Sequence, residues 1–325
     1  MAGSAGLRDA ASVPETTLAI GGFTLPKWEP AAAVCVCQSA AGPVSAEIGG
    51  DLLMVSEAHT TPAEFSTVDA SADPGGLIRF LDAARSVSGL SAAKNALLEQ
   101  LALGQAQAAL DVGCGAGGDM AEMARLMPDG AHVSGLDVSE TMIAEARRRT
   151  ASLATRVSLR IGDAADLPYD DQAFDACRAA TVLQHVPDPA RVLSEMARVT
   201  RPGGRVGALE FDQETLFLDH PDPETTRIIV DAFAGAMIQG HVGRQLPRMF
   251  QTAGLTDVSV TPRVILANAQ FLRTLLQDHV ARLQGQGVLT GQRASQWWAE
   301  LQTWAQAGGF AGGVIVFVVT ASRPS

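Results

Sequence analysis

The chain has 325 residues, of which 47% are hydrophobic, so it is long enough for one large domain with a full core. Its formal net charge of −11 argues against a nucleic-acid substrate, because binding a polyanion requires a basic patch. The longest apolar stretch, residues 314–319, is too short to span a bilayer, and no signal peptide is evident. We therefore expect a cytoplasmic protein with no membrane span.

Residues 1–72 are predicted to be an N-terminal extension, either partly disordered or a small β appendage. The first 14 residues have the composition of a disordered segment, and residues 17–25 and 46–56 each suggest short strands around a Gly-Gly pair. Cys35 and Cys37 have no second cysteine pair or histidines nearby, so a metal site is not expected there. A helical pattern then runs from Asp73 to Leu101.

The next segment combines a strand, a glycine-rich turn and a helix. An apolar run at residues 109–112 contains Asp111, glycines follow at 113, 115, 117 and 118, and a helical pattern covers residues 120–127. In this geometry backbone N–H groups can approach a nucleotide-like ligand. The spacing of Gly113, Gly115 and Gly118 also satisfies the dinucleotide fingerprint, so the glycines alone leave the choice of cofactor open.

Further short strands follow, and two of them end in an acidic residue that can face a ligand. Residues 131–137 end at Asp137, whose carboxylate can accept hydrogen bonds from ribose hydroxyls, and residues 157–164 contain Asp163. Residues 174–179 and 204–210 are predicted to be the fourth and fifth strands. Ser139 and Asp188 are predicted to begin the helices that follow.

Five segments in this order carry a family resemblance: DVGCGAGGD (111–119), GLDVSETMIAEAR (135–147), GDAADLPYDDQAFD (162–175), VLQHVPDPARVLSEMARVTRPGG (182–204) and AGLTDV (253–258). Together they resemble the class I S-adenosylmethionine (SAM)-dependent methyltransferases. Within these they are similar to the branch that contains the ubiquinone/menaquinone-biosynthesis and many natural-product methyltransferases. The resemblance implies an α/β, Rossmann-like sheet of seven strands, mostly parallel with one antiparallel strand and helices on both faces, within residues 73–325.

The resemblance also implies SAM as the cofactor, with S-adenosylhomocysteine (SAH) as its product. It places a set of residues around that cofactor: Asp111, Gly113, Gly115 and Gly117 at the methionine and ribose end, Asp137 at the ribose hydroxyls, Val138 on the adenine, and Asp163 with Ala164 at the adenine edge.

The C-terminal part is predicted to add helices and two strands. Helical patterns at residues 223–237, at 243–253 and, twice, within 269–308 suggest a helical cover at about 213–252 and 268–310. A sixth strand fits residues 257–266. The β-branched run at 314–319 suits a strand buried on both faces, which the resemblance inserts between the fifth and sixth strands. Trp297, Trp298 and Trp304 have helical spacing, which suits packing, a substrate cover or a dimer surface.

Methyl transfer is an in-line displacement for which the enzyme mainly aligns the nucleophile and removes its proton. Open α/β sheets bind ligands beyond the carboxyl ends of their strands, so candidates should follow the fourth and fifth strands. The candidate catalytic residues are His185, Glu210 and Asp212, and the candidate substrate-binding residues are Arg178, Gln184, His220 and Arg244. The spacing of the acidic residues and His220 is not diagnostic of a metal, and no metal site is predicted.

The sequence therefore predicts a SAM-dependent methyltransferase that acts on an O, C or N atom of a small organic metabolite, natural-product or quinone-like, and it is compatible with a homodimer. Three alternatives stay open at this point. They are a peptide or protein methyltransferase, a SAM-binding protein that does not methylate (an enzyme of other chemistry or a sensor subunit), and an NAD-dependent oxidoreductase.

Overall fold

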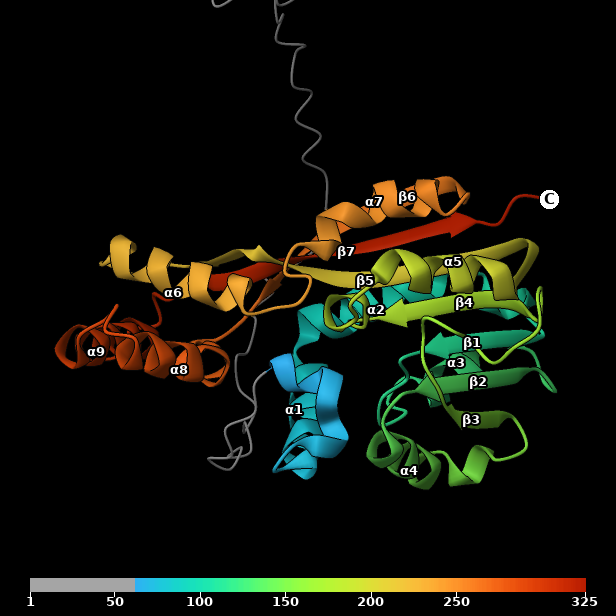
Figure 1. Ribbon diagram of the computed structural model, residues 1–325, viewed down its shortest axis with the longest axis horizontal. Coiled ribbons are helices and arrows are strands. Elements are labelled where there is room, and N and C mark those ends of the chain that lie inside the picture. The colour runs from blue at the N-terminus through green and yellow to red at the C-terminus, as the bar shows by residue number, and fades with distance from the viewer. Residues whose placement is uncertain (1–61) are drawn as a thin grey trace, which may run out of the picture. The chain divides into compact units, whose positions relative to one another are not determined.

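The computed structural model describes residues 62–325; the β strands and the disordered segment expected before residue 57, and Cys35 and Cys37, lie outside the described residues. Within this range the strands form one seven-stranded sheet in the order β3-β2-β1-β4-β5-β7-β6 (Figure 1). The strands are β1 (Ala108–Val112), β2 (His132–Asp137), β3 (Val157–Ile161), β4 (Phe174–Ala180), β5 (Thr200–Leu218), β6 (Thr256–Leu266) and β7 (Gly312–Ser322).

The strand directions confirm the predicted sheet. Strands β1 to β5 pair in parallel, whereas β7 runs antiparallel to both of its neighbours, β5 and β6. The chain moves outward from β1 through β2 to β3 and then returns to the other side of β1 with β4. This reversal makes the carboxyl ends of β1 and β4 the place where an open α/β sheet binds its ligand.

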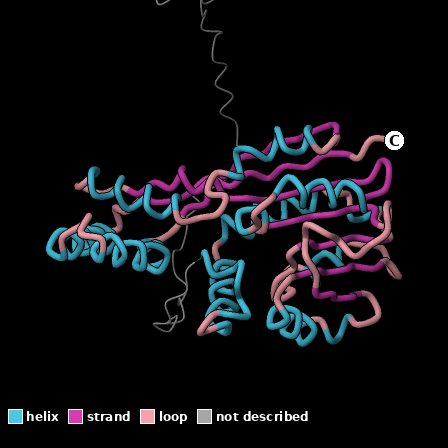
Figure 2. The backbone as a smooth tube through the Cα atoms, in the orientation of Figure 1, coloured by secondary structure: helices cyan, strands magenta, loops and turns pink. Residues whose placement is uncertain are grey.

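Helices cover both faces of the sheet and one of its ends (Figure 2). They are α1 (Pro74–Ser86), α2 (Ser88–Gln100), α3 (Met120–Leu126), α4 (Glu140–Arg149), α5 (Pro189–Val199), α6 (Pro223–Gly235), α7 (Val242–Thr252), α8 (Ala269–Gly285) and α9 (Gly291–Gln306). The predicted caps are present, since the Ser139 hydroxyl accepts a hydrogen bond from the Met142 N–H at 3.1 Å and the Asp188 carboxylate accepts one from the Arg191 N–H at 3.0 Å. The helical pattern of residues 73–101 divides into α1 and α2 at Val87, which has extended backbone angles.

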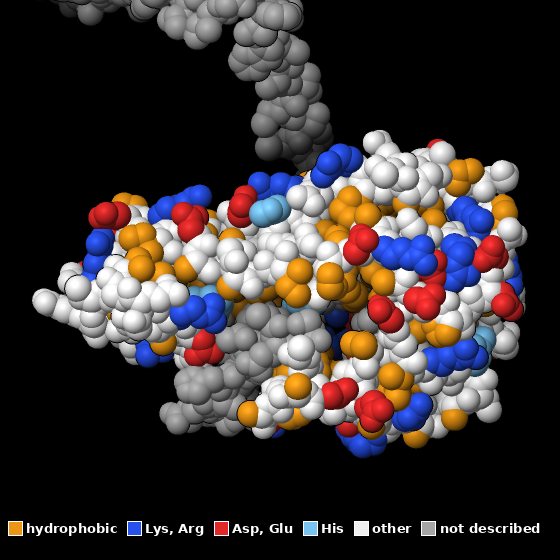
Figure 3. Space-filling view, viewed as in Figure 1, with side chains coloured by type: hydrophobic (Ala, Val, Ile, Leu, Met, Phe, Trp, Pro, Cys, Tyr) orange, Lys and Arg blue, Asp and Glu red, His pale blue; other side chains and the backbone are white. Residues whose placement is uncertain are grey.

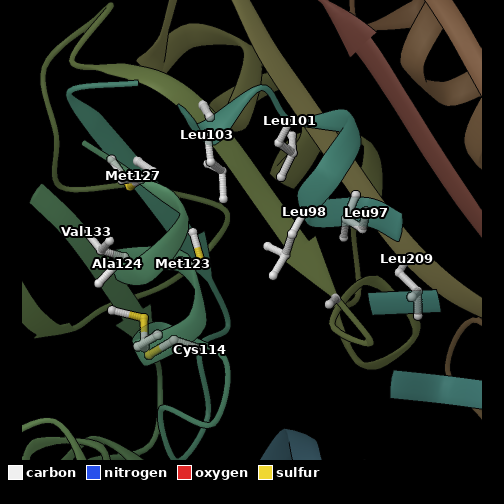
Figure 4. Packing of buried hydrophobic residues seen from close by; sticks show 14 of the residues in the cluster. Leu97, Leu98, Leu101, Leu103, Cys114, Met123, Ala124, Met127, Val133 and Leu209 are labelled. Atoms are coloured by element: carbon white, nitrogen blue, oxygen red, sulfur yellow. The ribbon is translucent and has the colours of Figure 1, made fainter. Parts of the chain in front are cut away.

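Three of the four clusters of buried side chains hold these layers together. One lies between the sheet and helices α2 and α3, as Figure 4 shows for Leu97, Leu101 and Met123. A second packs α5 and α7 on the opposite face. The third joins α6, α8 and α9 beyond the Leu218 end of β5 and includes Trp297, which is 1% exposed. This third cluster places the helical cover next to the carboxyl ends of the strands.

Strand β5 is longer than the sequence suggested, and this changes the position of two candidates. It pairs with β7 from Arg205 opposite Ser322 to Leu218 opposite Gly312, with one register shift between Asp212 and Phe217. The prediction that Glu210 and Asp212 follow the fifth strand is therefore wrong. Both residues lie inside β5, because β7 continues to supply a pairing partner beyond the point where the apolar run ends.

Candidate functional site

The loop between β1 and α3 is shaped by glycine. Gly113 has a φ of +66°, and a Cβ atom there would overlap the side chain of Val182 from the loop after β4. Only glycine combines this backbone angle with so close a neighbour. The N–H of Gly115 donates a hydrogen bond to the carboxylate of Asp137 at 2.8 Å, which ties the loop to the end of β2.

Asp137 ends β2 with its carboxylate facing the glycine loop. One oxygen accepts the hydrogen bond from Gly115, and the other accepts one from the Ser139 N–H at 3.0 Å. Burial raises the pKa of Asp137. Each carboxylate oxygen has a second lone pair, so both oxygens can still accept a hydrogen bond from a ligand hydroxyl.

A cluster of buried and half-buried charges lies beside the glycine loop. Its members come from five elements: Arg85 of α1, Lys94 of α2, Asp111 of β1, Asp119 at the start of α3 and Arg178 of β4. Arg178 places Nη2 at 2.6 Å from Asp119 and Nε at 2.9 Å from Asp111, the latter without hydrogen-bond alignment. Lys94 lies 3.1 Å from Asp119, and Arg85 also contacts it.

This charge cluster holds three cations and two carboxylates. Burial opposes ionisation of Asp119, but Arg178, Lys94 and Arg85 together hold its pKa well below the usual range. Arg178 is 2% exposed, and its Nη1 has no hydrogen-bond partner among the described residues. A buried guanidinium N–H without a partner is costly, so this position suits a further anionic group.

The predicted adenine-binding residues line the same cavity. Val138 follows β2 and is 60% exposed, a large value for an apolar side chain at the end of a buried strand. Asp163 and Ala164 follow β3, where the Asp163 carboxylate accepts a hydrogen bond from the Ala165 N–H at 2.8 Å. The predicted residue Gly117 does not line the cavity and faces α4 instead.

One cavity of about 590 Å³ continues from the glycine loop to the helical cover. Asp111, Gly113 and Asp137 line one part of it, and side chains from β5, α6 and α8 line the other. Phe65 and Val68 of the 3-10 segment Pro62–Ala70 also line it, so part of the predicted N-terminal extension contributes to the site. Figure 3 shows hydrophobic side chains gathered around a hollow in the middle of the molecule, next to α1.

Two polar side chains stand between the two parts of the cavity. Gln184 belongs to the 3-10 turn Leu183–His185 after β4, and its side-chain oxygen accepts a hydrogen bond from the Gln213 amide at 2.9 Å. His185 follows, with its ring centroid 5.5 Å from that of Phe65. Burial lowers the pKa of His185 to about 4, so the ring is neutral at physiological pH.

The two acidic candidates of β5 do not line the cavity. Glu210 is 0% exposed and accepts hydrogen bonds from the N–H groups of Val182 at 2.8 Å and Leu183 at 2.7 Å, with Gln184 N at 3.4 Å. Glu210 therefore anchors the loop that carries Gln184. Asp212 instead forms a two-point ion pair with Arg244 of α7, one contact of which is 2.7 Å.

Two candidate substrate-binding residues also lie outside the cavity lining. Arg244 is occupied by Asp212, as described. His220 accepts a hydrogen bond at Nδ1 from the Asp222 N–H at 3.0 Å, and its Nε2 lies 3.0 Å from the carbonyl oxygen of Trp297. Because a carbonyl can only accept, Nε2 carries the proton, and both ring nitrogens have partners within the fold.

Glu210, Asp212 and His220 do not converge on one point. Over residues 62–325, the structure contains no group of three or more His, Cys, Asp or Glu side chains arranged to hold a metal ion. In the same range, no helix is both long and apolar enough to cross a membrane.

Sequence reasoning missed several polar residues of the site, among them Arg85, Lys94, Asp119 and Gln213. Asp119 directly follows the glycines, so its place in the motif was a usable signal. Arg85 and Lys94 lie in a helical segment whose charges resemble an ordinary solvated face. Gln213 could be found only once β5 was known to continue past Glu210.

The strand order, the glycine loop and the acidic end of β2 together define a class I methyltransferase fold with a cavity at the switch of strand order. A family model described as a methyltransferase domain matches residues 110–207. A demethylmenaquinone methyltransferase of Halalkalibacterium halodurans is 34% identical over 181 residues, which cover 51% of this chain and 74% of that protein. The chain belongs to the SAM-dependent methyltransferases, and SAM is its cofactor.

Two further proteins extend the comparison. An uncharacterized 37.1 kDa protein of transposon Tn4556 from Streptomyces fradiae is 34% identical over 276 residues, which cover 84% of this chain and 78% of that protein. The structure of Haemonchus contortus phosphoethanolamine N-methyltransferase 2 in complex with phosphomonomethylethanolamine and S-adenosylhomocysteine has a TM-score of 0.52. Its identity is 18%, over 82% of this chain and 61% of that one, so it shows a shared fold.

Proposed function

We propose that this methyltransferase acts on an O, C or N atom of a small organic metabolite, natural-product or quinone-like, and releases SAH. The observation that carries the proposal is the single cavity that joins the glycine loop to a chamber under the helical cover, with Gln184 and His185 between them. A cavity of this size with a mostly hydrophobic lining suits a small organic molecule.

The residues of the first part fit SAM. The Asp137 carboxylate has lone pairs left for the two ribose hydroxyls, and Val138 offers an exposed apolar surface for the adenine. The unpartnered Nη1 of Arg178, in a cluster with one more cation than carboxylates, suits the carboxylate of the methionine moiety. Gly113 leaves the space that a Cβ atom would fill. When bound, SAM supplies an electrophilic methyl group on its sulfonium.

The residues at the junction of the cavity then act on the acceptor. Gln184, held by Gln213, orients its polar group, and the neutral ring of His185 accepts the proton that an O–H, N–H or activated C–H loses. Glu210 holds the backbone of this loop and contributes by positioning. Segment Pro62–Ala70 and α1 cover the site, where Asp82 of α1 pairs with Arg149 of α4 at 2.7 and 2.9 Å.

The test uses methyl-labelled SAM and an extract of the host cells. Wild-type protein should transfer label to organic-extractable small molecules, and mass spectrometry of the product should identify the acceptor atom. The Asp137→Ala variant, which lacks the proposed ribose ligand, is the negative control. Label found in protein instead would refute the small-molecule acceptor. SAH binding without any transfer, across extracts from several growth stages, would favour a non-methylating role.

A further inference from the structure

The charges that line the cavity are confined to one part of the chain. Among residues 62–325, every Asp, Glu, Lys or Arg side chain in the lining lies between residues 82 and 178, in the covering helices α1 and α2 or around strands β1 to β4. Most of them are paired with each other, as in Asp82 with Arg149 and Arg178 with Asp119. From residue 211 onward, every side chain of the lining is uncharged.

The uncharged chamber is mostly aromatic and aliphatic. β5 contributes Phe211 and Leu216, α6 contributes Phe233, and α8 contributes Phe271 and Leu275. A charged ligand group that entered this chamber would lose part of its hydration without gaining a partner of opposite charge among the lining residues from 211 onward. Burying an unpaired charge is far more costly than burying an apolar or hydrogen-bonded group.

Strand β5 keeps its own charges out of the chamber. Phe211 and Gln213 line it, whereas the intervening Asp212 points to the other face of the strand and is 1% exposed. Arg244 contacts both Asp212 and, at 3.1 Å, Glu214. The alternation therefore places the carboxylates of Asp212 and Glu214 against Arg244, on the face away from the ligand.

One end of the chamber is polar without being charged. Gln213 donates a hydrogen bond to the side-chain oxygen of Gln184, so the amide N–H groups of Gln184 and the oxygen of Gln213 can still bond a ligand. His185 lines the cavity next to this pair. A ligand hydroxyl or carbonyl can be bonded here while the rest of the molecule contacts only apolar side chains.

We propose that the acceptor is an uncharged, largely apolar molecule with a hydroxyl or carbonyl group, which Gln184 and Gln213 bind while its apolar body fills the chamber between β5, α6 and α8. This inference rests on the proposed function and names the substrate class of the same site. It excludes acceptors whose carboxylate, phosphate or ammonium group must enter the chamber.

The experiment measures binding without turnover. The full chain, saturated with SAH at pH 7, is titrated with three probes of the same ring size: 2-naphthol, 2-naphthoate and the ammonium form of 2-naphthylmethylamine. We expect 2-naphthol to bind at least tenfold more tightly than either ion. Equal or tighter binding of an ion overturns the proposal, and so does the absence of 2-naphthol binding to protein that binds SAH. Failure to bind SAH would instead refute the proposed function.

A charge introduced at the chamber wall tests whether the preference for the uncharged probe arises in the chamber. Ile238 lines the cavity and is 49% exposed, so Ile238→Lys should fold and should shift the preference at least fivefold towards 2-naphthoate. The matched control is Val260→Lys, at an apolar residue of β6 that is 40% exposed and outside the lining. A similar shift in both variants, or in neither, overturns the assignment of the chamber as the acceptor site.

Discussion

Replacement of Glu210 by glutamine should stabilise the protein relative to wild type as the pH rises. Burial raises the pKa of Glu210 from 4.5 to about 8, although the hydrogen bonds from backbone N–H groups to its carboxylate act to lower the pKa. Because the folded pKa is the higher one, the stability contributed by this group is fully present below pH 4.5 and is lost as the pH rises towards 8. At about 1.4 kcal/mol per pH unit, the loss reaches about 3 kcal/mol at pH 7.

A glutamine at this position avoids that loss, because its amide does not titrate and its oxygen can still accept from the N–H groups of Val182 and Leu183. Urea denaturation at pH 5, 6, 7 and 8 should show the free energy of unfolding of Glu210→Gln rising relative to wild type by about 2–3 kcal/mol between pH 5 and 7. Glu99→Gln, at an exposed residue of α2, controls for the removal of one carboxylate. A difference that stays constant with pH would refute the reasoning, since it would mean that the N–H donors outweigh burial.

Three other substitutions test the remaining parts of the site. His185→Gln should lower kcat by at least about 100-fold. The pH profile of wild-type kcat/KM should show no inflection near pH 6.5, because burial lowers the pKa of His185 to about 4. A wild-type inflection near pH 6.5 that the variant lacks would contradict this. Gly113→Ala should abolish the SAH binding that calorimetry measures. The control Gly130→Ala, at a φ of +84° with open space around the residue, should still bind SAH. Equal SAH affinities in the two variants would count against the steric argument. Arg178→Met should lower the free energy of unfolding by about 3–5 kcal/mol, more than Lys94→Met, because the buried Arg178 side chain contacts both carboxylates of the cluster. An equal loss in the two variants would contradict this special role of Arg178.

All but one of the residues predicted to hold the cofactor line one cavity, and this grouping could be predicted from the sequence because they are local to strand ends. Asp111, Gly113 and Asp137 each lie at or just after a strand whose apolar run is legible, and parallel strands bring their carboxyl ends to one edge of the sheet. The position of β7 between β5 and β6 followed from the family resemblance that these segments carry. The charge cluster could not be predicted in this way, because Lys94 and Arg178 are 84 positions apart and meet only through the packing of α2 against the sheet.

The acceptor part was misjudged for a different reason, which lies in the length of one strand. The sequence suggested that β5 ends at Glu210, so the acidic residues around it were assigned to a loop that faces the ligand. The strand continues to Leu218, and a period of two then divides its residues between two faces. Phe211 and Gln213 line the cavity, while Asp212 is turned towards Arg244. The residues that resembled catalytic acids are therefore those that the strand removes from the chamber, and their removal is what leaves the chamber suited to an uncharged acceptor.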